Sequence, residues 1–194
     1  MSARLVVLAS GHGTNLQSVI DACATAQIEG RVVAVVSDRP AAHALDRARA
    51  ATIAAIALPR RDGETRPDYD ARLADEVSAY EPDWIVLAGW MRILTMSFLG
   101  RFPNRVINLH PALPGEFAGT DAIERAFAAG LERTGVMVHL VPDEGVDDGP
   151  VLATAIVAIR GDDTIETLRE RIHATEHDLL VSTLARLCTQ EVTA

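Results

Sequence analysis

Cysteine and aromatic residues are scarce in this sequence of 194 residues. It contains two cysteines, Cys23 and Cys188, and aromatic side chains make up 4% of the chain. Two cysteines cannot build the framework of several disulfides on which small secreted domains depend. Both lie in apolar helical patterns, so we interpret them as reduced thiols of the core.

Basic residues and long apolar runs are also lacking. The chain has 18 Lys and Arg against 27 Asp and Glu, a net charge of -9. This excess of acid argues against a nucleic-acid platform, although a few arginines and backbone N–H groups still suffice for a small anionic substrate. No window is long enough for a membrane span, and the apolar start at 5–9 is too short for a signal peptide. We therefore expect a cytoplasmic protein that binds small molecules.

Short apolar runs alternate with helical patterns along the chain. The predicted strands are 4–9, 31–36, 53–58, 83–88, 106–109, 135–141 and 151–159. The predicted helices are 16–23, 41–51, 67–80, 122–129 and 164–187. This alternation predicts βαβ units and an α/β fold: a Rossmann-like, open, mostly parallel twisted sheet with helices on both faces. No repeat or linker composition interrupts it, so we expect one domain over residues 1–194.

Asn108 and His110 form the most informative pair of polar residues. They lie two apart at the end of a predicted strand, so their side chains project to the same face. Pro111 cannot donate to a sheet, so the strand is expected to end there, at the edge where open α/β sheets bind ligands. An amide donor beside an imidazole suits a carbonyl that becomes an oxyanion, with a nearby carboxylate raising the pKa of the imidazole. A polar strand end with a satisfied histidine is the alternative.

The acidic segment 143–150 offers that carboxylate. It contains Asp143, Glu144, Asp147 and Asp148 between glycines and Pro150. Glycine and proline are turn formers first, so the segment is equally explained as a solvated turn. The alternating ligands of a calcium-binding EF-hand loop are absent.

The turn 10–15 joins the first strand to the first helix. Gly11 and Gly13 allow backbone N–H groups to face a ligand, and a helix N-terminus favours a phosphate. A third glycine of a dinucleotide fingerprint is missing, and so is a Walker lysine. The sequence leaves two interpretations open, a phosphate site or a tight turn in which Thr14 caps the helix.

Two further groups of residues carry less specific signals. Arg92 follows a predicted strand inside an apolar segment, where it either binds the carboxylates of a flat ligand or extends outward to solvent. His173, Glu176 and His177 share one face of the last helix. They are too few and in the wrong order for zinc, so we predict no metal site and expect this face to meet a substrate or solvent.

Taken in order, these motifs resemble the folate-dependent glycinamide ribonucleotide formyltransferases of purine synthesis. The resemblance covers nearly the whole chain. It rests on Ser-Gly-x-Gly-Thr-Asn-Leu at 10–16, Leu-Ala-Gly-Trp-Met-Arg-Ile-Leu at 87–94, Ile-Asn-Leu-His-Pro at 107–111, Gly-Val-Asp-x-Gly-Pro at 145–150 and Glu-His at 176–177.

The resemblance implies formyl transfer from 10-formyltetrahydrofolate, the co-substrate, to glycinamide ribonucleotide (GAR), by a monomer or homodimer that needs no metal. It implies that Asn108, His110 and Asp147 are catalytic. The residues that it assigns to GAR are Gly13, Thr14 and Asn15 at the phosphate, with His173 and Glu176 on the rest. The residues that it assigns to the folate are Arg66, Met91, Arg92, Ile93, Leu94, Asn108, Asp143 and Glu144.

The sequence departs from this family pattern in several places. The segment 111–119 lacks the double leucine and the second loop proline usual in relatives, Asp121 stands near the place where many relatives carry histidine, and no Tyr-Pro follows His177. The stretch from His139 to Asp147 is one residue longer than usual. Asp147 and Asp148 therefore compete for the catalytic place, and we choose Asp147 because relatives read Asp-x-Gly-Pro.

Other activities of the same superfamily are the first alternative: formyl transfer to initiator tRNA or a sugar nucleotide, or hydrolysis to formate. We expect a tRNA enzyme to carry a basic surface and a further C-terminal domain, and a hydrolase to carry an N-terminal regulatory domain. A non-catalytic nucleotide-binding module is the second alternative. Such a module would keep the turn at 10–15 without requiring Asn108, His110 and Asp147 to converge.

Overall fold

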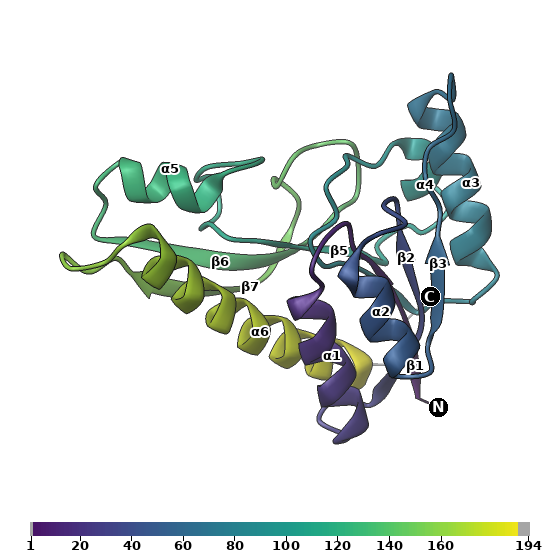
Figure 1. Cartoon of the computed structure of the whole chain (residues 1–194), viewed down its shortest axis with the longest axis horizontal. Helices are drawn as coiled ribbons and strands as arrows, with labels where there is room; N and C mark the ends of the chain where they lie inside the picture. The colour runs from purple at the N-terminus through teal and green to yellow at the C-terminus, as the bar shows by residue number, and fades with distance from the viewer. Residues whose placement is uncertain (1, 190–194) are drawn as a thin grey trace.

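The apolar runs of the sequence form seven strands of one sheet in the computed structural model, which describes residues 2–189 (Figure 1). The strands are β1 (Ala3–Leu8), β2 (Gly30–Ser37), β3 (Ala54–Ala57), β4 (Trp84–Leu87), β5 (Val106–His110), β6 (Arg133–Leu140) and β7 (Val151–Ala158). Their order across the sheet is β3-β2-β1-β4-β5-β6-β7. The first five strands in this order pair in parallel, whereas β5 pairs with β6, and β6 with β7, in antiparallel fashion, which confirms a mostly parallel sheet.

Helices cover both faces of this sheet, as predicted. They are α1 (Thr14–Ala24), α2 (His43–Ala50), α3 (Arg66–Ser78), α4 (Met96–Leu99), α5 (Ala122–Ala128) and α6 (Ile165–Thr189). Buried residues of α1, α2 and α6 pack with one set of strand side chains, and those of α3 and α4 pack with the opposite set. Figure 1 shows α1 and α2 side by side, with α6 running beneath β6 and β7.

The chain reverses its direction across the sheet between β1 and β4. After β1 it moves outward through β2 and β3, and it then returns to place β4 on the other side of β1. Ligands of open α/β sheets bind at such a switch point, outside the carboxyl ends of the strands. Here the backbone N–H of Ser10, after β1, donates to the carbonyl of Gly89, after β4, at 3.0 Å. This crevice is where the candidate residues of the two strand ends meet.

Most predicted elements agree with the structure to within two residues at each end. Helix α4 was not predicted, because four residues are too few to show a helical period. The predicted start of α6 is confirmed by reciprocal bonds: the Thr164 hydroxyl accepts from the N–H of Thr167 at 3.3 Å, and the Thr167 hydroxyl accepts from the N–H of Thr164 at 3.0 Å. Within residues 2–189, no helix combines the length and apolar character that crossing a membrane requires.

The two cysteines lie half-buried against the core formed by α1 and α6. Burial raises the pKa of the Cys23 thiol, and it raises the pKa of Cys188 to about 12. Both thiols therefore stay protonated at neutral pH, which agrees with their interpretation as core residues.

Candidate active site

The end of β5 presents Asn108 and His110 to the same side of the sheet. The strand stops at His110 because Pro111 follows it, as the sequence predicts. Asn108 is half-buried, and His110 is only 4% exposed. A buried histidine needs partners for both ring nitrogens, so its neighbours define what it can do.

Asp147 joins the two side chains. Its Oδ1 accepts a hydrogen bond from Asn108 Nδ2 at 2.9 Å, and its Oδ2 lies 3.2 Å from His110 Nδ1. Oδ2 also accepts from the backbone N–H of Gly119 at 2.8 Å. An amide, an imidazole and a carboxylate from distant segments thus meet in one hydrogen-bonded cluster.

The structure separates Asp147 from Asp148. Asp147 adopts a left-handed backbone with φ of 54°, and its side chain is buried against His110. Asp148 instead lies against Gly145, where a Cβ on the glycine would meet its carboxylate. Asp143 also folds locally, its Oδ1 accepting from the N–H of Gly145 at 2.9 Å. Among the four acidic residues of the segment, only Asp147 contacts Asn108 and His110 within the described chain.

Burial dominates the ionisation of His110. It lowers the pKa of the imidazole, and the opposing effect of the Asp147 carboxylate is smaller. The sequence-based expectation that a carboxylate would raise this pKa is therefore wrong for the net direction, because sequence does not reveal the depth of burial. The other nitrogen, Nε2, lies 3.1 Å from the carbonyl of Phe117, a residue in a left-handed conformation with φ of 45°.

Asp147 is held as a carboxylate. Burial alone would raise its pKa, but the close approach of His139, the hydrogen bond from the N–H of Gly119 and the nearby His110 together outweigh burial, so the pKa is lowered. A neutral imidazole beside an ionised carboxylate is an arrangement that can accept a proton and then stabilise the resulting cation.

His139 belongs to this cluster and was not predicted. It stands on β6 directly opposite Asn108, with Nε2 at 3.2 Å from Asn108 Nδ2 and 3.5 Å from Asp147 Oδ1. Its Nδ1 lies 2.8 Å from the carbonyl of Leu140, which can only accept, so we place the ring hydrogen on Nδ1. His139 could have been predicted only from the register between β5 and β6, which places it opposite Asn108 and which a single sequence does not reveal.

A cavity of about 580 Å³ opens beside these residues. Of the predicted folate residues, those that line it are Met91, Arg92, Ile93, Leu94, Asn108 and Asp143. Met91 and Ile93 are exposed by 61% and 46%, so the segment offers apolar side chains to a flat ligand. Glu144 and Arg66 instead brace the rim: Glu144 Oε1 accepts from the N–H of Met96 at 3.0 Å, and Arg66 donates to the carbonyl of Ile93 at 3.1 Å.

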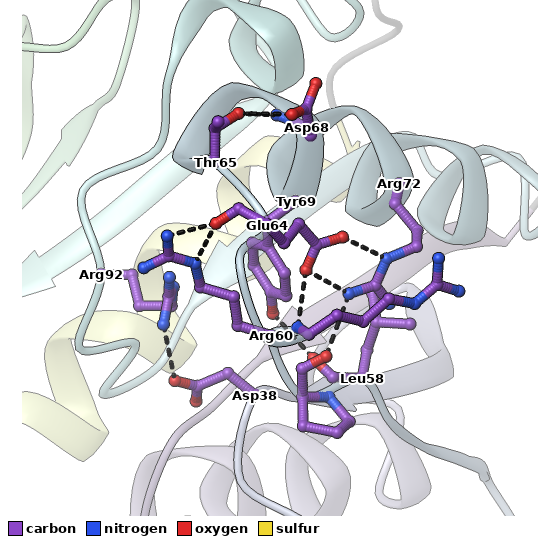
Figure 2. Close-up of polar contacts among 11 residues, drawn as sticks. Asp38, Leu58, Arg60, Glu64, Thr65, Asp68, Tyr69, Arg72 and Arg92 are labelled. Atoms are coloured by element: carbon purple, nitrogen blue, oxygen red, sulfur yellow. Dashed lines mark hydrogen bonds and ion pairs between the residues drawn. The ribbon is translucent and has the colours of Figure 1, made fainter.

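Arg92 turns toward the side of the cavity where α3 begins. Its guanidinium lies 4.6 Å from the centre of the Tyr69 ring and 3.7 Å from Asp38. Figure 2 shows this ion pair with Asp38. Arg92 neither extends outward nor contacts the cluster of Asn108, His110 and Asp147 in the described chain. The loop beside it is fixed by Glu64, which accepts two bonds of 2.8 Å from Arg72 that lower the pKa of Glu64 to about 2 (Figure 2).

The turn at 10–15 leaves its backbone donors free. In the described chain none of the N–H groups of residues 11–15 donates to another protein group, as expected at the start of a helix. Gly13 is the N-cap of α1, with φ of 72° and no side-chain cap, so the interpretation in which Thr14 caps the helix is wrong. A Cβ at Gly13 would lie 2.9 Å from the Cα of Ala44, so this position requires glycine.

Glu176 of α6 faces the same turn. It is only 6% exposed, and it accepts a hydrogen bond from Asn15 Nδ2 at 3.4 Å, while His173 lies 4.0 Å away. Burial raises the pKa of Glu176 to about 7. Asn15 Oδ1 has no partner in the described chain. Among residues 2–189, no group of three His, Cys, Asp or Glu side chains is arranged to hold a metal ion.

Comparison with known proteins shows the family of the chain. Residues 3–184 match the family described as formyl transferase. The chain belongs to the formyl transferase family. It is 45% identical over 191 residues to the phosphoribosylglycinamide formyltransferase of Mycobacterium tuberculosis H37Rv, covering 98% of this chain and 87% of that protein.

Other formyl transferases are similar over most of their length. The phosphoribosylglycinamide formyltransferase of Escherichia coli K12 is 41% identical over 173 residues, which covers 89% of this chain and 81% of that one. The crystal structure of glycinamide ribonucleotide transformylase 1 from Symbiobacterium toebii superposes with a TM-score of 0.92 at 40% identity, covering 96% and 87% of the two chains. These likenesses confirm the fold that the sequence predicts.

Proposed function

We propose that this formyl transferase carries the formyl group of 10-formyltetrahydrofolate to the amine of GAR, in purine biosynthesis. The products are formyl-GAR and tetrahydrofolate. The observation that supports it most is the contact of Asp147 with both Asn108 and His110 beside a cavity of about 580 Å³. The proposal treats residues 1–194 as one domain acting in the cytoplasm, on two small molecules and without a metal. Monomer and homodimer both stay open.

The donor occupies the cavity beside β5. Its flat ring stacks on the apolar segment of Met91, Ile93 and Leu94, and Asp143 lies at the same rim. Arg92 and Arg66 serve the acidic tail, because guanidinium groups bind carboxylates in pairs of hydrogen bonds. The hydrogen bond that Glu144 accepts from the N–H of Met96 holds the rim of the cavity in place. The formyl group then lies next to Asn108 and His110.

The acceptor lies over the turn at 10–15, where Glu176 of α6 faces the start of α1. Free N–H groups of Gly13, Thr14 and Asn15 bind its phosphate, since a helix N-terminus favours an anion. Glu176 and His173 bind the ribose and glycinamide portion. Burial raises the pKa of Glu176, and hydroxyl groups of the substrate would donate hydrogen bonds to its carboxyl group in addition to the one from Asn15.

The reaction joins the two sites. The amine nitrogen attacks the formyl carbon, a C–N bond forms, and the π electrons move to the formyl oxygen. This oxygen accepts a hydrogen bond from Asn108 and, once His110 has taken a proton, a second one from His110 Nε2–H. His110, neutral because burial lowers its pKa, takes the proton of the amine at Nε2 once the substrate displaces the carbonyl of Phe117. Asp147 stabilises the imidazolium through Nδ1. The bond from carbon to N10 then breaks, and His110 returns the proton to N10.

Steady-state kinetics test this proposal. The wild-type chain is supplied with 10-formyltetrahydrofolate, and tetrahydrofolate formation is followed by absorbance with and without GAR, beside His110→Ala. We expect turnover that requires GAR and falls by at least about 10³-fold in the variant. Equal turnover with and without GAR would favour a hydrolase. If the wild-type protein shows no turnover either with or without GAR, a non-catalytic binding module becomes the better interpretation.

A further inference from the structure

Two exposed histidines stand together beside the turn at 10–15. His12 belongs to the turn itself, and His43 is the first residue of α2. Their rings are stacked, with centroids 5.3 Å apart and an interplanar angle of 18°. Neither residue has a role in the proposed mechanism. Figure 1 shows why they meet: α1 and α2 lie side by side and begin at the same edge of the sheet.

The backbone fixes the pair in relation to the turn. The carbonyl of Gly11 accepts from the N–H of Ala44 at 3.1 Å, and the space beside Gly13 is filled by Ala44. Arg47 adds a second tie, because its Nε donates to the carbonyl of His12 at 2.8 Å and its Nη1 donates to Gln17 Oε1 at 3.1 Å. These carbonyl groups point toward α2. The carbonyl groups of the turn therefore face α2, whereas its N–H groups stay available to the substrate.

Charge around the pair favours an anion. One carboxylate, Asp46, lies 3.6 Å from His43 Nδ1, and Arg49 already engages it at 2.8 Å. Arg47 supplies a permanent positive charge behind the turn, and its guanidinium contacts no carboxylate in the described chain. No carboxylate contacts His12 in the described chain either. The positive charge of Arg47 beside the turn thus has no carboxylate partner among the described residues, which favours an anion there.

We propose that His12, oriented by its stack on His43, is a further binding residue for the phosphate of the ribonucleotide. This inference rests on the proposed function, and it deepens that function by adding an ionisable group to a site otherwise built from backbone N–H groups. A histidine gains its charge between pH 8 and pH 5. A phosphate monoester keeps most of its double negative charge at pH 7. The contact therefore strengthens as the pH falls toward 6.

Four proteins test the inference in the formyl-transfer assay: the wild type, His12→Ala, His12→Lys and the control Arg31→Ala. Arg31 is an exposed cation near the start of β2, at the opposite edge of the sheet. We expect His12→Ala to raise KM for GAR about fivefold at pH 6 and less than about twofold at pH 8.5. His12→Lys removes this pH dependence by keeping its charge, and Arg31→Ala changes nothing. The turnover number and KM for the donor stay at wild-type values throughout.

A second measurement separates failure of this inference from failure of the proposed function. Inorganic phosphate is titrated into the wild-type chain at pH 6 while NMR follows the imidazole C–H resonances, assigned with His12→Ala and His43→Ala. We expect the resonances of His12 to shift with phosphate and those of His173 to shift less. An unchanged KM in His12→Ala, or resonances of His12 that ignore phosphate, overturns the inference even if GAR is formylated. If the chain shows no turnover with GAR but the resonances of His12 still shift with phosphate, only the proposed substrate is overturned.

Discussion

Replacing Glu176 by glutamine is expected to make the chain more stable at alkaline pH. Glu176 is 6% exposed, has no cation within 3.5 Å among described residues, and has a pKa raised by burial to about 7. In the unfolded chain the same carboxyl titrates near 4.5. Between these values the unfolded chain loses its proton first, so ionisation favours unfolding.

The sign and size follow from this difference. A folded-state pKa above the unfolded value contributes stability that is full below about pH 4.5 and is lost as the pH rises to about 7. Each pH unit of this interval corresponds to about 1.4 kcal/mol, so the loss approaches about 3 kcal/mol above pH 8. Glutamine stays neutral at every pH, and its amide supplies a donor for the unpartnered Asn15 Oδ1.

Urea unfolding at pH 5 and pH 8 measures the effect. We expect the free energy of unfolding of Glu176→Gln to exceed that of the wild type by about 2–3 kcal/mol more at pH 8 than at pH 5. Glu170→Gln, an exposed change on the same helix, is the control and shows no such trend. A difference between Glu176→Gln and wild type that is equal at both pH values would refute the reasoning.

Three other substitutions probe the site. Asp147→Asn is expected to lower kcat by about 10²–10⁴-fold, since asparagine tolerates the left-handed backbone but lacks the charge. The kcat of Asp148→Asn is expected to stay within about twofold of the wild-type value. Equal losses of kcat in the two variants would contradict the choice of Asp147 over Asp148. Gly13→Ala is expected to lower the free energy of unfolding by about 2–3 kcal/mol, whereas Gly11→Ala is expected to lower it by less than about 0.5 kcal/mol, because a Cβ at Gly11 meets nothing within 4 Å. Urea unfolding checks both variants, and equal effects would count against the tight approach of Ala44 to Gly13. His139→Ala is expected to lower kcat about 10²-fold with KM for both substrates within about threefold, as a positioning residue should; wild-type kcat would remove His139 from the cluster.

The strands and the main site were predictable because their signals are local. Apolar runs followed by turn residues fix β1, β4 and β5, and Pro111 fixes where β5 ends. The spacing of Asn108 and His110 places them on one face without further information. Resemblance to a family then supplied Asp147, which the residues alone left in competition with Asp148.

The remainder depends on distances that a sequence does not contain. His139 enters the cluster through the register of β6 against β5, and a slip by one residue would turn it to the other face. The pKa of His110 depends on how deeply the fold buries it, which outweighs the carboxylate that the sequence does reveal. The contacts of His12 with His43 and of Arg92 with Tyr69 likewise arise between a loop and a helix that are separated along the chain.

Transfer of a labelled carbon tests the central claim most directly. The chain is incubated with 10-formyltetrahydrofolate carrying ¹³C in the formyl group, together with GAR, and the products are identified by NMR. We predict that the label appears as the formamide of formyl-GAR in proportion to the tetrahydrofolate released, and that Asp147→Asn abolishes both. Label recovered as formate while GAR stays unmodified would contradict the account.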